Sequence, residues 1–189
     1  MQDFVSESSW AVSAVEFPDL ELPCNLVAMN SSSSSDPKRE LLRHSLATLA
    51  YRGGKSIRGA SDGFGDFAGA GKTPRQILTH IGDLLEWALT LANGTRKWQN
   101  TEPLPWTREG ERFFATLKAF DDYLASSEPL QAPIEKLFQG PVADALTHVG
   151  QLAMLRRMAG EPIAAENYFI AEVIVGRVGE EQALPKRKG

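Results

Sequence analysis

The stretch TPRQILTHIGDLLEWALTLANG, residues 73–94, decides the fold. Its apolar residues recur every three or four positions, the spacing of one face of an α-helix. They are Ile77, Ile81, Leu84, Leu85, Ala88 and Leu91. An amphipathic helix of this length must bury its apolar face against other elements, so the stretch predicts a packed helical domain.

The two ends of this helix also carry signals. Thr73, with Gln76 three residues later, forms the capping-box pattern T-x-x-Q, and Pro74 stands at the first helical position. Asn93-Gly94 is a stop signal. Gly71-Lys72-Thr73 resembles the end of a P-loop, but Asp66 occupies the position of the first P-loop glycine and no apolar strand precedes it. The stretch is therefore interpreted as a helix start and not as a nucleotide site.

Three further segments show the same period, at 36–51, 107–126 and 141–159. Gly53-Gly54 is expected to stop the first, and Gly140 is expected to precede the last. The apolar stripe of the helix at 36–51 is Leu41, Leu42, Leu46 and Leu49, and that of the third helix, at 107–126, is Phe113, Phe114, Leu117, Phe120 and Leu124. No segment alternates with the period of a strand, so the predicted fold class is all-α, a four-helix bundle.

Charge divides the chain of 189 residues into unequal parts. Residues 1–36 contain six acidic residues and no Lys or Arg, and Ser31–Ser35 is a serine run typical of a linker. We expect an acidic N-terminal extension over 1–36, the bundle over 37–180, and a basic tail over 181–189.

Composition excludes several classes of function. The net charge of −4 does not favour nucleic-acid binding, and no run of 18 apolar residues predicts a membrane span. The start of the chain lacks signal-peptide features, and Cys24 is the single cysteine, so no internal disulfide forms. Together these features predict a cytoplasmic protein with neither a nucleic-acid nor a membrane partner.

Polar residues interrupt the apolar faces of two helices. His80 lies between Ile77 and Leu84 on the stripe of the second helix. In the fourth, Asp144, His148 and Gln151 are spaced i, i+4, i+7 and share one face. Asp and His one helical turn apart can bind the same cation, and an uncompensated buried Asp would cost several kcal/mol. Gln151 can support such a site from behind.

The three candidate ligands match in height only for one topology. If the second and fourth helices run parallel, His80, Asp144 and His148 lie within about one helical turn, ~5.4 Å, of the same level. If the helices are antiparallel, this match carries no weight. The alternative to a metal is a core His80 that is hydrogen-bonded to a neighbour, with Asp144 placed to favour the helix dipole.

Other polar or aromatic residues near these helices have simpler interpretations. His44 is expected to pair with Glu40 on the surface of the first helix, although it is kept as a possible addition to the site. Trp87 shares the face of His80 and is expected in the core or as a pocket wall. Arg156-Arg157 is expected to be solvated.

The motif T-P-x-x-I-L-x-H80, together with D144-x-x-x-H148-x-G-Q151 and L-R-R-x-x-G160, resembles the DinB/YfiT-like superfamily over about residues 37–175. The resemblance implies a four-helix bundle in which three side chains hold a divalent metal, zinc or nickel, with open positions for water or substrate. The usual three ligands are histidines, so Asp144 departs from the pattern. The superfamily includes thiol S-transferases and a mycothiol-dependent isomerase.

Two hypotheses follow. In the first, His80, Asp144 and His148 hold a divalent cation in an enzyme, a thiol-dependent S-transferase or a hydrolase, that acts on a small molecule and uses a low-molecular-weight thiol. In the second, the bundle is a non-catalytic, stress-related binding module without a metal. The sequence names no further catalytic residue, and it leaves open whether the chain forms a homodimer.

Overall fold

A computed structural model describes residues 36–69 and 71–185 of the chain. The acidic extension up to residue 35 and the end of the basic tail, 186–189, lie outside the described residues, so the expectations for them stay predictions.

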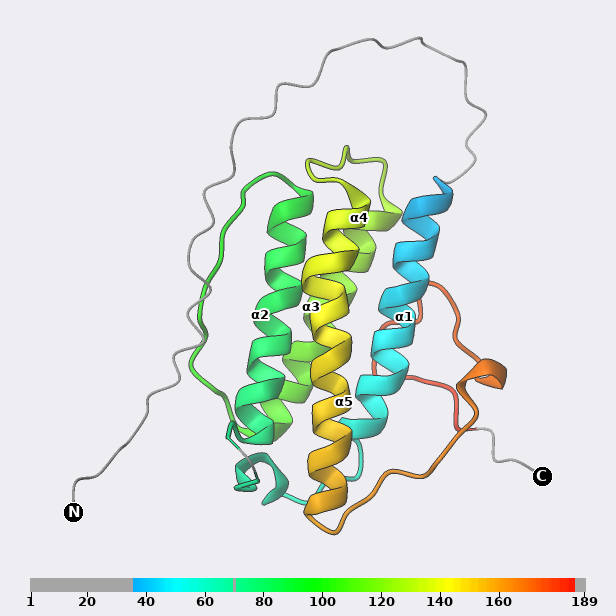
Figure 1. The fold of residues 1–189 in the computed structure, drawn as a ribbon. Helices are drawn as coiled ribbons and strands as arrows, with labels where there is room; N and C mark the ends of the chain where they lie inside the picture. The colour runs from blue at the N-terminus through cyan, green and yellow to red at the C-terminus, as the bar shows by residue number, and fades with distance from the viewer. Residues whose placement is uncertain (1–35, 70, 186–189) are drawn as a thin grey trace, which may run out of the picture. The chain divides into compact units, whose positions relative to one another are not determined.

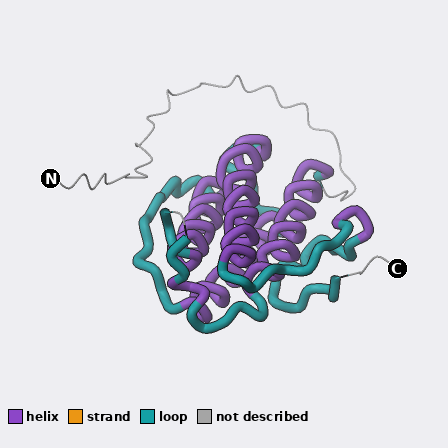
Figure 2. The backbone as a smooth tube through the Cα atoms, turned by 60° about the horizontal axis from the view of Figure 1, so that its bottom comes forward, coloured by secondary structure: helices purple, strands orange, loops and turns teal. Residues whose placement is uncertain are grey.

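Four long helices form the body of the domain (Figure 1). They are α1 (Pro37–Ile57), α2 (Pro74–Ala92), α3 (Trp106–Ala125) and α5 (Ala143–Met158). The shorter elements are η1 (Phe64–Asp66), α4 (Ile134–Leu137), the π-helical turn η2 (Phe138–Val142) and η3 (Tyr168–Ile170). No strand occurs between residues 36 and 185 outside residue 70, and Figure 2 shows only helices and loops there. The all-α prediction is confirmed.

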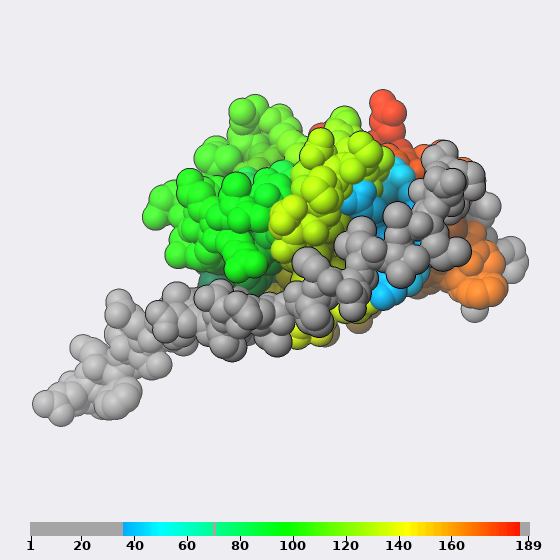
Figure 3. Space-filling model, turned by 90° about the horizontal axis from the view of Figure 1, so that it is seen from above, coloured from blue at the N-terminus to red at the C-terminus, as the bar shows by residue number. Residues whose placement is uncertain are grey.

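Two pairs of neighbouring helices are parallel: α1 with α5, and α2 with α3. In Figure 1, α1 and α5 run downward, whereas α2 and α3 run upward. A short turn cannot join two parallel helices, so residues 93–105 return along the outside of α2 as a crossover segment. At the upper end, the residues that join α3 to α5 lie between the end of α2 and the start of α1 (Figure 3). There, Gln131 N–H donates to the carbonyl of Ala92 at 2.8 Å.

The apolar faces meet in one core. The stripes predicted for α2 and α3 are buried apart from the partly buried Leu91. Among the residues with no exposed surface are Leu46, Leu49, Leu78, Ile81, Leu85, Phe113, Leu117, Phe120 and Leu152. Leu41 was expected on the stripe of the first helix, but it is 67% exposed. A second link between α1 and α3 is polar, because Arg43 pairs with the buried Asp121 at 2.9 Å.

The predicted ends of α2 are confirmed. The Thr73 hydroxyl accepts from Gln76 N–H at 3.3 Å, and the Gln76 side chain accepts from Thr73 N–H at 2.9 Å, which completes the capping box. Asn93 caps the C-terminal end, and Gly94 adopts a φ of 84°. Thr73 therefore acts as a helix cap, as the sequence predicted.

The predicted stop of the first helix is wrong. Gly53 and Gly54 are buried inside α1, which continues to Ile57. A Cβ atom on Gly53 would lie 2.4 Å from the ring of Phe113 on α3. The glycine is therefore explained by close packing of the two helices and not by a helix end.

The fourth helix, predicted over 141–159, is present as α5 (Ala143–Met158), but other helical turns precede it, where Gly140 was expected to mark its start. Helical structure begins at Ile134, passes through η2, and continues into α5. Pro141 lies inside the π-helical turn. Proline has no N–H to donate, and a local widening of the helix accommodates it without ending the helix. Asp144 thus stands just after an irregular turn and not in the first turn of a free helix end.

Arg156 is not solvated, contrary to the sequence prediction. It is 6% exposed and donates to the carbonyls of Ser56, Arg58 and Gly59, which follow or end α1. These unpaired carbonyls at a helix end need donors, and the guanidinium supplies several at once. Arg157 is exposed as predicted.

The segment after α5 packs back along α1 without long helices. Tyr51 and Lys55 of α1 both bond the side chain of Glu166, at 2.5 and 2.6 Å. Val178 is buried in the core. Within residues 36–69 and 71–185, no helix is both long enough and apolar enough to cross a membrane.

Two helical glycines allow a matched test of the close packing between α1 and α3. Gly53→Ala should lower the free energy of unfolding by about 1–3 kcal/mol, since the new methyl group overlaps the buried Phe113 ring. Gly150→Ala on α5 meets nothing within 4 Å, so it should raise that free energy by about 0.5–1 kcal/mol through helix propensity. Urea unfolding of both variants measures the difference; equal shifts would contradict this account of Gly53.

Candidate metal centre

Two antiparallel helices bring the predicted ligands together. His80 projects from α2, and Asp144 and His148 project from α5 one turn apart. The ligand atoms of the three side chains all lie within 4.8 Å of one another. Among the residues that the structure describes, His80, Asp144 and His148 form a group whose ligand atoms are close enough together to hold a metal ion.

The Asp144 carboxylate lies between the two imidazoles. Its Oδ1 is 3.4 Å from His148 Nε2, and its Oδ2 is 3.9 Å from His80 Nε2. The two imidazole rings are nearly perpendicular, with centroids 4.9 Å apart. Neither carboxylate distance is a hydrogen bond of good length, so the three groups face one point without satisfying one another.

His148 has a fixed orientation. Its Nδ1 lies 2.9 Å from the Gln151 side-chain oxygen, one turn further along α5. An amide oxygen only accepts, so Nδ1 is a ring nitrogen that carries a proton, and Nε2 is the nitrogen that faces Asp144. The predicted contact of Gln151 with the candidate site is thus present, and its support of a metal ligand stays a prediction. The Thr147 hydroxyl, 3.3 Å from Asp144 Oδ1, adds a contact to the carboxylate.

The surroundings of His80 favour its neutral form. Burial lowers the pKa of His80, and the charges of His148 and Lys72 lower it further, whereas Asp144 and Asp83 act in the opposite direction. A metal binds the neutral imidazole, so the same surroundings keep His80 ready to bind one.

The donor set and its spacing fit a divalent ion. In a tetrahedral zinc site with ligands at about 2.0–2.2 Å, neighbouring ligand atoms are roughly 3.3 Å apart. The His148–Asp144 separation of 3.4 Å matches this value, and the His80–Asp144 separation of 3.9 Å is slightly longer. All three ligand atoms lie within 4.8 Å of one another. Two imidazoles and one carboxylate suit zinc and nickel.

Two arguments from the sequence do not hold in the structure. The helices are antiparallel, so counting from their starts does not explain the shared level of the ligands. The Asp144 side chain is 47% exposed, so leaving it without a cation does not carry the cost of a buried charge. Support for a metal therefore comes from the convergence of the ligand atoms.

Of the other residues considered from the sequence, His44 lies away from the candidate site, whereas Trp87 contacts it through Trp98. His44 is exposed on α1 and outside the cluster, and Glu40 pairs with Arg43, not with His44. Trp87 is partly buried and stacks edge-to-face with Trp98, at 5.6 Å between centroids. Trp98 in turn stacks edge-to-face with His80, at 6.0 Å. Trp98 was not predicted at the site, because this residue lies in the crossover segment and outside the helical pattern of the sequence.

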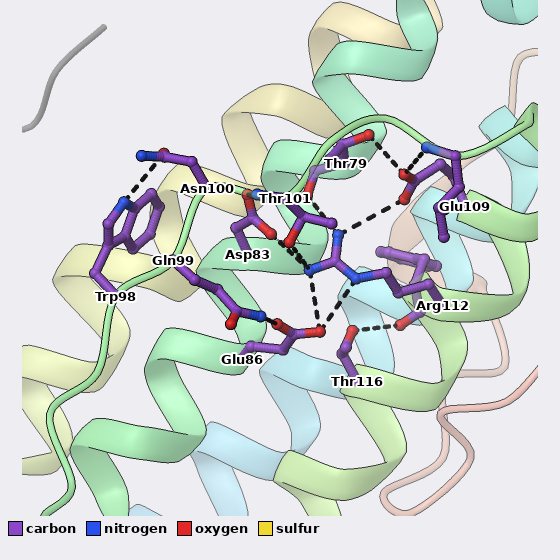
Figure 4. Close-up of polar contacts among 12 residues, drawn as sticks. Thr79, Asp83, Glu86, Trp98, Gln99, Asn100, Thr101, Glu109, Arg112 and Thr116 are labelled. Carbon is purple, nitrogen blue, oxygen red and sulfur yellow. Dashed lines mark hydrogen bonds and ion pairs between the residues drawn. The ribbon is translucent and has the colours of Figure 1, made fainter.

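A buried polar cluster around Arg112 was also missed (Figure 4). The Arg112 guanidinium, from α3, donates to Asp83 at 2.5 Å and to Glu86 at 3.1 Å, both on α2. It also donates to the Thr101 hydroxyl of the crossover segment at 3.2 Å. We call Arg112, Asp83, Glu86 and Glu109 the Arg112 cluster. One signal was available: Glu109 and Arg112 are charged residues one turn apart beside the apolar stripe of α3.

The chain matches no protein-family model, no curated protein and no solved structure. The resemblance to the DinB/YfiT-like superfamily therefore rests on the residues quoted above, and the candidate site rests on its own geometry.

The low pKa of His80 predicts a pH-dependent stability of the metal-free protein. Because the folded state disfavours protonated His80, its contribution is present above the ordinary pKa of 6.5 and is lost as the pH falls through the lower folded-state pKa. Urea unfolding between pH 7.5 and 5, with a chelator present, should show this loss. His80→Gln should flatten the curve in this range, whereas the control His44→Gln should follow the wild type.

Proposed function

We propose that this protein is an enzyme that works with one divalent metal ion, held by His80, Asp144 and His148. The single observation that carries the proposal is the convergence of three ligand atoms within 4.8 Å of one another, from two helices. Three protein ligands leave positions for water or substrate, which is the arrangement of catalytic rather than structural zinc sites.

Each side chain has a separate role in this proposal. His148 offers Nε2, since Gln151 holds its other ring nitrogen. His80 offers a neutral imidazole because burial lowers its pKa. Asp144 supplies the one negative charge, and its partial exposure leaves the site open to solvent on one side. A bound ion supplies Lewis acidity, which lowers the pKa of a water or thiol that reaches it.

The class of reaction is proposed from the resemblance. A DinB/YfiT-like bundle with this motif favours a thiol-dependent S-transferase or a hydrolase acting on a small molecule. The all-helical fold and the meeting of the motif's polar residues agree with that assignment. Zinc and nickel are the proposed ions.

Metal binding is measured by calorimetry after the protein is stripped with chelator. We expect about one Zn²⁺ or Ni²⁺ per chain, and a higher melting temperature with the ion because it binds only the folded state. His80→Ala and His148→Ala should each abolish tight binding, and Asp144→Asn should weaken it. Gln151→Leu should weaken it about 10- to 100-fold, the usual effect of losing the partner of a ligating histidine.

His44→Ala is the matched control, because His44 is exposed and outside the cluster. It should bind the ion as the wild type does. If the wild type binds no ion after repletion, or if the double variant His80→Ala/His148→Ala binds as well as the wild type, the proposal is wrong and a non-catalytic module becomes the better interpretation.

The thiol part of the proposal has its own test. Co²⁺-loaded protein titrated with 2-mercaptoethanol should develop a thiolate-to-metal charge-transfer absorption, since a metal with an open position can bind a deprotonated thiol. The spectrum of the His148→Ala protein, treated in the same way, should not change. Cobalt that binds while the spectrum stays unchanged would favour the hydrolase over the transferase.

A further inference from the structure

We infer that the crossover segment is part of the metal centre: Trp98 positions His80, and the Arg112 cluster holds Trp98 in place. The inference rests on the proposed function, because it assigns the surroundings of the same metal site. Trp98 is a positioning residue in this account and does not bind the ion.

The first step is the contact between the two rings. The His80 ring has Trp98 at 6.0 Å and His148 at 4.9 Å between centroids, both close to perpendicular. No hydrogen bond of His80 to another described side chain fixes its ring, unlike His148, which Gln151 orients. Edge-to-face packing therefore sets the direction of the His80 ring, and Trp98 is the partner in that packing that is not itself a candidate ligand.

The second step is what holds Trp98. The indole N–H donates to Asn100 at 3.1 Å, within the segment itself, and the indole packs on Trp87 of α2. Just beyond it, Thr101 N–H donates to Asp83 Oδ2 at 3.1 Å and Gln99 donates to Glu86 at 2.5 Å. Further along, Leu104 N–H donates to Glu109 at 2.8 Å.

The Arg112 cluster connects the contacts of the crossover segment to the helix that carries His80. Arg112 donates to the same two carboxylates, Asp83 and Glu86, that accept from the crossover segment, so its guanidinium holds both acceptors in place. Asp83 lies one turn after His80 on α2, so the anchor and the ligand share one rigid helix. A side chain beside the ion is thus fixed by polar contacts on a neighbouring face of that helix (Figure 4).

The contact with Trp98 is tested with Ni²⁺, which quenches the emission of nearby indoles. Trp98→Phe should lose the larger part of the Ni²⁺-dependent quenching and keep near-wild-type affinity, because a phenyl ring preserves the packing. Trp98→Ala should bind Ni²⁺ about three- to tenfold more weakly, in line with the loss of one aromatic pair. The control is Trp106→Phe, whose ring packs on Phe64; it should keep both quenching and affinity.

The anchor is tested with Asp83→Asn, which keeps the size of the side chain but replaces one of its two acceptor oxygens with a donor. Trypsin should cut faster after Arg96 and Lys97 in this variant, and Ni²⁺ affinity should fall about as much as in Trp98→Ala. The double variant should be no weaker than either single one. Asp122→Asn, an exposed carboxylate on α3, is the control.

The outcomes separate the two proposals. A wild type that binds no Ni²⁺ would overturn the proposed function and this inference with it. A wild type that binds Ni²⁺, while Trp98→Ala binds equally tightly and Trp98→Phe is still quenched, would overturn the inference alone. Unchanged trypsin cleavage in Asp83→Asn would remove the Arg112 cluster from it.

Discussion

The Arg112 guanidinium is the interaction on which the arrangement of α2, α3 and the crossover segment depends. Because α2 and α3 are parallel, the chain has to return along the bundle between them, and the returning segment has no helix of its own. Arg112 reaches from α3 to the Thr79 carbonyl and the Asp83 carboxylate of α2, and to Thr101 of the segment. With five donors, a planar guanidinium can bond Thr79, Asp83, Glu86 and Thr101 at once, whereas a lysine ammonium has only three donors.

The charges in this cluster do not balance, and that defines its role. One guanidinium faces three carboxylates. The Oε2 atom of Glu109 lies 3.7 Å from the Arg112 guanidinium, and it is buried without a hydrogen bond among the described residues. Such groups gain little net stability once the cost of removing them from water is counted. Losing one member is costly, because the others stay buried without it. The Arg112 cluster is therefore better understood as fixing one arrangement of the segment than as a source of stability.

Local signals in the sequence predicted local structure well. The capping box at Thr73 and the stripe of α2 gave the correct helix, and the two polar interruptions, at His80 and at Asp144 with His148, gave residues that meet. The errors concern residues whose role depends on a distant partner. Gly53 was predicted to end a helix, but it is explained by the Phe113 ring packed against it. Arg156 was predicted to be solvated, but it bonds carbonyls at the end of α1. Trp98 had no helical pattern to mark its contacts, since a crossover path is not encoded in periodicity, and Arg112 lies in a predicted helix but has its partners on other elements.

The candidate site shows why convergence is a stronger argument than burial. The carboxylate of Asp144 is partly exposed, so water can hydrate its charge and its position alone does not require a cation. The two histidines are different: they face the same carboxylate, their ring centroids are 4.9 Å apart, and the charge of His148 lowers the pKa of His80. The ligand atoms of both imidazoles and of the carboxylate lie within 4.8 Å of one another. A divalent ion between them would bind both imidazoles and the carboxylate together, whereas one proton can join at most two of the three groups.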